Sequence, residues 1–371
     1  MPERSPPRLL TLILLTGLSV LSLNMFLPSL SNIANAFETD YSLISVSIGG
    51  YLIVAAVLQL IMGPLSDLIG RRPVVLVGLA LFVVASVGCL LAQNVWVFLG
   101  FRLLQGAVVG GMIVSRAIVR DTAEPAEAAR LLGLIGTAMA LAPFLGPSFG
   151  GILDQVFGWR ANFIAYAIAG TLMLVICWRD LGETNTQPSA TFAAQFRQYP
   201  ELFRSRVFWG YTVCLVFSIG AFYAFIAGAP HVGSEAFSLS AGWLGAGIGV
   251  ISGGFMAGTY LSARLAHRTK LLRIVLVGRV CASVGPLIAV SLLAAGLWHP
   301  VTFFAGAVTV GFGNGLTVPG GNVGVMSVDP RLSGSASGLS GALTVVGGAA
   351  FTFVSGAVAT GPRGPFALLA L

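Results

Sequence analysis

One acid and two bases stand close together in the segment GPLSDLIGRRP, residues 63–73, and these residues could form a switchable ion pair. Asp67 precedes Arg71 and Arg72 by about one helical turn, so it can pair with either base. Gly63 permits close approach of a neighbouring helix, and Gly70 permits a tight turn with positive φ. The pattern predicts a charge lock at one end of the molecule, which holds in one conformation and breaks in another.

Arg102 is a charged residue inside a long apolar run. A lone arginine in hydrocarbon costs about 2.5–3.5 kcal/mol on insertion scales, so its guanidinium needs an acceptor or water. We therefore expect Arg102 to face a central cavity, and the alternative is a buried arginine that caps backbone carbonyls of the first span. Arg279 lies nearer the end of its run and is expected to snorkel to the membrane surface.

No other arrangement of residues points to catalysis or to a metal. The four cysteines stand inside apolar runs without metal-ligand spacing, and the three histidines lie far apart in sequence. The apolar runs contain no Ser/His/Asp constellation, and the chain has no nucleotide-binding loop. We therefore expect no enzymatic activity, no metal, no cofactor and no drive by ATP.

The composition indicates which elements must position these residues. The chain has 371 residues, of which 56% are hydrophobic and 9% are charged. A soluble domain has about 25% charged residues, and a disordered chain is poor in apolar residues, so both classes are excluded. The apolar runs are continuous rather than alternating, which favours helices over a β-barrel. The sequence predicts an all-α integral membrane protein embedded in a lipid bilayer.

The long apolar runs and their breakers predict eleven membrane spans, since one span needs about 20 apolar residues. They cover residues 9–31, 43–64, 73–93, 96–118, 131–153, 162–179, 207–228, 240–263, 271–295, 301–324 and 334–358. Another apolar run, FALLAL, begins after Gly364 and stops at Leu371. We interpret it as a twelfth helix that is truncated.

The charged stretch after the sixth span divides the chain into two halves. Residues 1–180 are predicted to form an N-terminal six-helix half, 181–206 a cytoplasmic linker, and 207–371 a C-terminal half. A weak internal sequence similarity supports this division. The segments LSDLIGRR (65–72) and LSARLAHR (261–268) resemble each other, and both follow the second span of their half. Two repeats about a central axis are a common plan for transporters.

Charge predicts the orientation in the membrane. With the N-terminus in the cytoplasm, almost all Lys and Arg residues outside the spans fall on the cytoplasmic side, and only Arg160 and Arg363 fall outside. The net charge of +7 is then explained by cytoplasmic loops rather than by nucleic acid. We expect a multi-pass protein of the inner (plasma) membrane.

Three segments resemble signature motifs of the major facilitator superfamily. Residues 63–73 resemble its loop 2–3 motif, and FRLLQG (101–106), with Arg102 and Gln105, resembles its span 4 motif. APFLGPSFGG (142–151) resembles the span 5 motif of its antiporters, through Pro143, Gly146, Pro147, Gly150 and Gly151. Together with MFLPSLSNIA, IVRD and GWR, they make the chain similar to drug:proton antiporters of the Bcr/CflA-like multidrug efflux type.

The resemblance implies a fold of two six-helix halves and export by alternating access around a midplane site. It also implies that Arg102 takes part in proton coupling, and that Asp121 joins the network of Asp67 and Arg71. The glycines of residues 142–151 predict a close seam between helices, and the two prolines favour a kink.

Asn24 departs from the pattern of these relatives, which commonly carry Asp at this position. Asn cannot titrate, and no acid of the chain falls at a membrane midplane in the predicted topology. Three alternatives stay open. Asp154 reaches into the outward cavity, or Asp67 or Asp121 takes the proton, or the carrier does not use protons.

Polar and aromatic side chains of the spans are the candidates for a substrate cavity. They are Asn24, Phe26, Tyr51, Gln59, Phe217, Phe222, Tyr223, Phe225 and Asn314. With no acid and one arginine in the predicted cavity, we expect neutral or anionic amphiphiles rather than cations. The leading prediction is a monomeric exporter of drugs or small amphiphiles, coupled to protons. The alternatives are an uncoupled facilitator or metabolite exporter on the same fold, and a non-transporting receptor.

Overall fold

The computed structural model describes residues 7–185, 202–265, 268–328, 333–359 and 363–370. Within these ranges the regular structure is helical, with no strand. Ten helical stretches, counted over the same residues, are long and apolar enough to cross a membrane. The prediction of an all-α membrane fold is confirmed.

The helices up to residue 180 include several that are interrupted by short turns. In chain order they are α1 (Leu9–Asn24), the 3-10 turn η1 (Leu27–Ser29), α2 (Leu30–Ala36), α3 (Tyr41–Ile69), α4 (Arg71–Leu91), α5 (Val95–Leu104), the 3-10 turn η2 (Gln105–Val108), α6 (Val109–Thr122), α7 (Pro125–Phe157) and α8 (Arg160–Asp180).

The helices after residue 205 are long and uninterrupted, apart from a short one at the end. They are α11 (Arg206–Phe237), α12 (Ala241–Leu265), α13 (Leu271–Ala294), α14 (Pro300–Met326), α15 (Ser333–Val358) and α16 (Gly364–Ala370). Residues 366–370 of the run FALLAL lie in α16, which packs against α11, α13, α14 and α15. Residues 186–201 of the predicted linker lie outside the described residues, and the predicted linker boundaries stay a prediction.

Two predicted spans contain a change of helix type. The first span is interrupted at Pro28, the second residue of η1, because proline lacks the N–H that continues an α-helix. The fourth span tightens into η2 directly after Leu104, two residues past Arg102. The predicted spans at 9–31 and 96–118 are therefore not single α-helices, and both changes occur next to polar residues.

The motif at residues 63–73 is mostly helical rather than a loop. α3 continues through it as far as Ile69, and α4 begins at Arg71. Only Gly70 interrupts the helix, with φ of 100°, a value that residues with a side chain rarely adopt.

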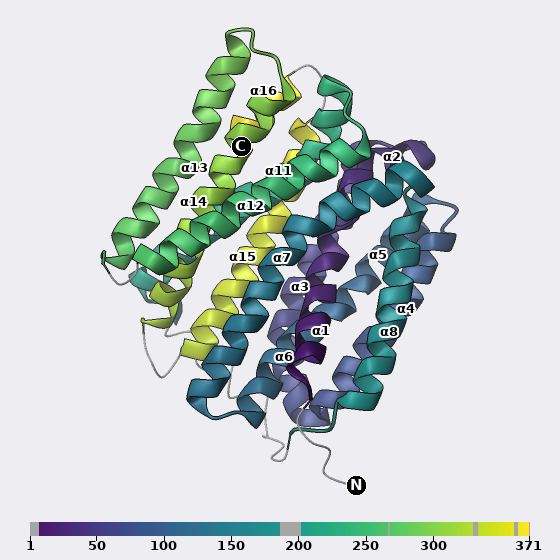
Figure 1. Ribbon diagram of the computed structural model, residues 1–371, viewed down its shortest axis with the longest axis vertical. Coiled ribbons are helices and arrows are strands. Elements are labelled where there is room, and N and C mark those ends of the chain that lie inside the picture. The colour runs from purple at the N-terminus through teal and green to yellow at the C-terminus, as the bar shows by residue number, and fades with distance from the viewer. Residues whose placement is uncertain (1–6, 186–201, 266–267, 329–332, 360–362, 371) are drawn as a thin grey trace.

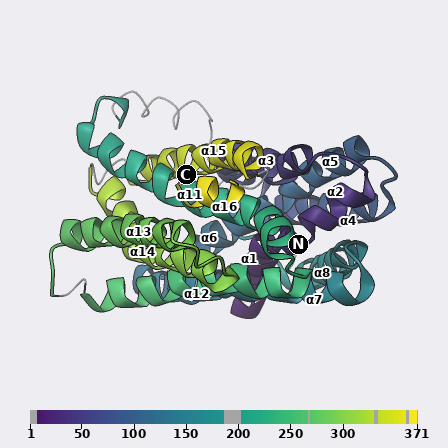
Figure 2. The ribbon, with the colours of Figure 1, turned by 90° about the horizontal axis from the view of Figure 1, so that it is seen from above.

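The helices gather in two sets (Figures 1 and 2). α1 to α8 pack mainly among themselves, as do α11 to α16. The two sets meet along two seams, where α7 packs against α12 and α3 packs against α15. We call the end of the bundle where α1 begins and α3 meets α4 the N-terminal face. The opposite end, where α7 meets α8 and α11 meets α12, is the distal face.

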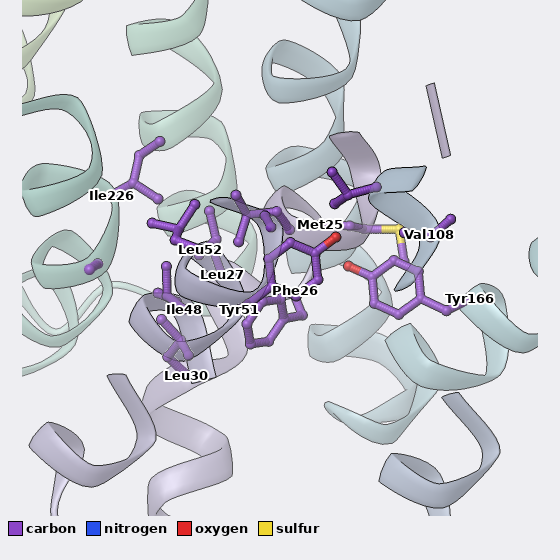
Figure 3. Packing of buried hydrophobic residues seen from close by; sticks show 14 of the residues in the cluster. Met25, Phe26, Leu27, Leu30, Ile48, Tyr51, Leu52, Val108, Tyr166 and Ile226 are labelled. Atoms are coloured by element: carbon purple, nitrogen blue, oxygen red, sulfur yellow. The ribbon is translucent and has the colours of Figure 1, made fainter. Parts of the chain in front are cut away.

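The interruption at η1 lies at the centre of the buried core. Phe26, Leu27 and Leu30 are fully buried there, and Figure 3 shows them beside Ile48 of α3 and Ile226 of α11. η1 also packs against α7 and α12. The interrupted first span therefore contacts both sets of helices near the distal face.

Candidate transport site

The charged residues of the motif at 63–73 meet around Arg71, which is buried at the start of α4. Its Nη1 lies 2.5 Å from Oδ1 of Asp67, and its Nε donates a hydrogen bond of 3.0 Å to Oδ2 of Asp121. The structure thus brings Asp121 to Asp67 and Arg71, from which it is distant in the chain. Arg72 points elsewhere, and its Nη2 donates to the backbone carbonyl of Trp178 at 3.0 Å.

Glu183, which follows α8, completes this network and was not predicted. Its two carboxylate oxygens accept hydrogen bonds from the backbone N–H groups of Arg71 (2.9 Å) and Arg72 (3.2 Å). An anion at a helix N-terminus satisfies free N–H groups and interacts favourably with the helix dipole. Asn185 Nδ2 also donates to the carbonyl of Asp67 at 2.6 Å. The segment after α8 therefore holds the junction of α3 and α4.

Arg102 is fully buried, and neutral groups surround its guanidinium. Nη1 donates to Oε1 of Gln105 at 2.6 Å, and Nη2 donates to the backbone carbonyl of Ser22 at 2.7 Å. The guanidinium carbon lies 4.1 Å from the ring centre of Phe26 and 4.7 Å from that of Tyr51. Its partners are neutral, and among the described residues no carboxylate forms an ion pair with it.

Asn24 is not a hydrogen-bond partner of Arg102. Its Nδ2 donates to the carbonyl of Val20, one turn earlier in its own helix, at 2.8 Å. Asn24 instead lines a cavity between the two sets of helices.

This central cavity has a volume of about 470 Å³, and both sets of helices line it. Six of the predicted substrate residues lie on its wall: Asn24, Tyr51, Gln59, Phe222, Tyr223 and Asn314. The lining also includes Arg116, Met139, Ser252 and Phe255, which were not predicted as cavity residues. No acidic side chain belongs to the described lining.

Four expectations about the cavity are wrong. Arg102 does not line it, because Phe26, Tyr51 and Gln105 enclose the guanidinium. Phe225 does not line it either, because its ring is buried against Phe303. Phe26 is buried beneath Arg102 and has no exposed surface. Phe217 lies on the outer side of α11 with 58% of its surface exposed, and its ring packs against Phe351.

Arg279 is also held inside the protein rather than at the membrane surface. Its Nε donates to Oγ1 of Thr317 at 3.0 Å, and its Nη2 donates to Oδ1 of Asn314. Asn314 in turn donates to the carbonyl of Ser218 at 2.7 Å. This network fixes the orientation of Asn314 on the cavity wall.

The small residues of the segment 142–151 form close contacts on two sides of α7. A side chain at Gly150 would overlap the carbonyl oxygen of Met25, and one at Gly151 would overlap that of Ala241 on α12. Gly146 faces Leu21, and α7 continues through Pro143 and Pro147 without interruption. The predicted seam is present as a contact, and one side of it joins the two sets of helices.

Comparison with known proteins agrees with this geometry. The model of the major facilitator superfamily matches residues 12–352. The chain belongs to the major facilitator superfamily.

The solved structures agree on the fold. A bacterial homologue of the lysosomal transporter Spinster, in an inward-facing conformation, has a TM-score of 0.77 at 17% identity and covers 95% of this chain and 81% of its own. A D-xylose–proton symporter has a TM-score of 0.73 at 16% identity, with 94% and 90% covered.

The relatives in sequence include drug transporters of the superfamily. A chloramphenicol resistance protein of Pseudomonas aeruginosa is 36% identical over 57% of this chain, and the match spans only about half of that relative (51%). The multidrug transporter MdfA of Yersinia pestis is 29% identical over 77% of this chain and 70% of its own length. Multidrug resistance protein D of Escherichia coli is 25% identical over 99% and 93%. The resemblance to multidrug-transporter and drug-resistance members is therefore confirmed, and a transporter rather than an enzyme is identified.

The distal face of this superfamily member is closed by contacts that sequence reasoning missed. The hydroxyl of Tyr41 on α3 donates to the carbonyl of Ala227 on α11, and its ring stacks on His231 with centroids 4.5 Å apart. The hydroxyls of Ser31 and Ser234 lie 3.1 Å apart. In the sequence, the only indication of these contacts is that polar residues stand near the ends of the predicted spans.

Asp154 lies beside this closed region, at the end of α7. It is 5% exposed, and its Oδ2 accepts a hydrogen bond of 2.8 Å from Nδ2 of Asn32. Among the acids that the structure describes, Asp154 is the only buried one. No cation of the described chain forms an ion pair with it.

Proposed function

We propose that the chain is a secondary active transporter that exports drugs or small amphiphiles across the inner membrane by alternating access. The observation that carries the proposal is the central cavity of about 470 Å³ between the two sets of helices. Its wall is largely apolar and aromatic with a few polar groups, as expected of a small-molecule site. The names of the drug-transporting relatives support this choice of substrate.

Alternating access is supported by the uneven distribution of contacts between the two sets. Tyr41–Ala227, Ser31–Ser234 and the α7–α12 seam all lie toward the distal face. The distribution of Lys and Arg favours a cytoplasmic N-terminal face. On this orientation the conformation is closed to the outside, and the cavity is reached from the cytoplasm.

The proposal includes proton antiport through Asp154. Opening of the distal face would expose Asp154 to the outside and let it bind a proton there, and burial without a cation then favours the protonated form while that face closes. Release of this proton to the cytoplasm when substrate enters the cavity completes the exchange. Asp154 is followed by Gln155, which lies close to Gly242 of α12, so its surroundings change when the seam opens. Proton uptake from the outside is thereby tied to opening of the distal face.

An uncoupled facilitator or metabolite exporter is the second candidate. It is favoured by Asn24, which lies on the cavity wall and cannot titrate, and by the absence of acids from the described lining.

Everted membrane vesicles that contain the full-length protein and have a pre-formed acid interior distinguish the two. Chloramphenicol and a set of neutral and anionic amphiphiles are added while substrate uptake and lumenal pH are both followed. We expect wild type to release protons on addition of a substrate, Asp154→Asn to lose this release, and the matched surface variant Asp40→Asn to retain it. Uptake without proton release in wild type would support the facilitator. Absence of uptake of every compound would contradict export itself.

The variant Asn24→Asp tests the position where relatives commonly carry an acid. Proton release that appears only in this variant would show that the cavity position, rather than Asp154, can supply coupling.

A further inference from the structure

Arg116 is a cationic side chain on the wall of the central cavity. It projects from α6, and the cavity lining around it includes Val20, Met112 and Met139. Among the described residues its only polar contact is weak, because Nη2 lies 3.9 Å from the sulfur of Met139. A thioether is a poor acceptor, so this guanidinium has no strong hydrogen-bond partner in the part of the chain that the structure describes.

The other described arginines within the helix bundle differ from Arg116 in this respect. Arg71 contacts two carboxylates, Arg102 donates to a carbonyl and to Gln105, and Arg279 donates to Asn314 and Thr317. Each of these guanidinium groups is held by acceptors of the protein. Arg116 is therefore the one that keeps its donors available on the cavity side.

The surroundings of Arg116 make an incoming anion favourable. The described lining of the cavity contains no acid and is dominated by apolar and aromatic side chains. The side chain of Arg116 is exposed, so its guanidinium is open to a ligand, and it gains most from an opposite charge that also accepts hydrogen bonds. The planar guanidinium matches the two oxygens of a carboxylate or the oxygens of a sulfonate.

We infer that Arg116 binds the anionic group of an amphiphilic organic anion, and that this class is preferred to the matching neutral compound. The apolar body of such a ligand lies toward Phe222, Tyr223 and Phe255, which line the cavity from α11 and α12. The inference rests on the proposed export function, because it assigns the substrate class of the same cavity.

The test uses two fluorescent probes that differ only in charge, 11-(dansylamino)undecanoic acid and its methyl ester. Their binding to the full-length protein in phosphatidylcholine nanodiscs is measured by dansyl fluorescence, after subtraction of empty nanodiscs. We expect wild type to bind the acid about 10- to 100-fold more tightly than the ester, since hydrogen bonds to a charged group typically increase affinity by this factor. Arg116→Gln should lose this preference and bind the ester as wild type does.

Two further variants serve as controls. Arg116→Lys keeps the charge without the planar fork and should retain part of the preference. Arg264→Gln removes an exposed arginine of α12 that stacks on Tyr260, and should keep the full preference. A preference for the acid that persists in Arg116→Gln would overturn the inference, as would equal loss of both probes.

Failure of this inference and failure of the proposed function give different results in binding and in transport. If neither probe binds to wild type, the substrate site and the inference both fail. If the acid binds through Arg116 but neither probe enters everted vesicles, the binding site stands and the export function is contradicted.

Discussion

Gly151 of α7 lies directly against the backbone carbonyl of Ala241 on α12, and no side chain fits between them. Gly245 of α12 faces the carbonyl of Pro147 on α7 in the same way. Each helix thus offers a glycine to the backbone of the other. The two sets of helices can approach this closely near the distal face only because both positions lack a side chain.

Gly151→Ala should therefore prevent full closure of the distal face. The added methyl group overlaps the carbonyl of Ala241, so we expect the initial rate of substrate uptake in vesicles to fall about 5- to 150-fold, since overpacking of a close contact costs about 1–3 kcal/mol. Gly100→Ala, at a helical position with no atom within 4 Å, is the matched control and should transport normally. A wild-type rate in Gly151→Ala would contradict the role of the seam.

Ser31 and Ser234 offer a direct test of alternating access. Their hydroxyl oxygens lie 3.1 Å apart across the distal face, close enough for two cysteines at these positions to form a disulfide. In a chain whose four native cysteines are replaced by serine, we expect oxidation of Ser31→Cys/Ser234→Cys to stop transport and reduction to restore it. Each single-cysteine variant should be insensitive to oxidation. Transport by the oxidised, cross-linked protein would mean that the distal face need not open.

Glu183 is expected to stabilise the junction of α3 and α4. Its carboxylate accepts from two backbone N–H groups at the start of α4, so Glu183→Ala should lower the free energy of unfolding by about 0.5–2 kcal/mol, as for other lost helix caps. Glu183→Gln keeps an acceptor and should lose less. Thermal unfolding of the purified protein in detergent measures both, and equal stability of Glu183→Ala and wild type would refute the cap.

The fold could be predicted from the sequence because the membrane limits the possible elements. Long apolar runs between charges predicted helices that the structure confirms, since every backbone polar group in lipid must be paired within the chain. The interruptions at Pro28 and after Arg102 were not predicted. Pro28 explains the first change, since proline lacks the N–H that continues an α-helix, but both runs are long enough to be interpreted as single spans despite the polar residues nearby.

The site was predictable only where a local motif fixes the geometry. Asp67 and Arg71 are one helical turn apart, so their pairing follows from spacing. Glu183 is more than a hundred residues away from its partners, and no local pattern indicates that contact. The prediction that Phe26 and Phe217 face the cavity was also wrong. A helix that is apolar on all sides gives little information about which side faces the cavity.

Asp67 and Asp121 share the buried guanidinium of Arg71, so their substitutions should not be additive. Asp67→Asn and Asp121→Asn each leave one carboxylate, and we expect each to cost about 1 kcal/mol or less, since both acids are partly exposed. The double variant leaves Arg71 without an anion among these partners and should cost several-fold more than the sum. Thermal unfolding of the four proteins completes the cycle, and simple additivity would show that the two pairs are independent.

Arg102 is held entirely by neutral groups away from the cavity, which favours a structural role in joining α5 to α1. Arg102→Gln removes the donor to the carbonyl of Ser22 and should lower the free energy of unfolding by about 1–3 kcal/mol, because a buried acceptor is left unpaired. We expect this variant to retain downhill substrate uptake in vesicles without a pH gradient. Arg279→Gln, which disturbs the other internal arginine network, is the control for general loss of packing. Unchanged thermal stability together with loss of only the proton-driven component of uptake would instead assign Arg102 to proton coupling.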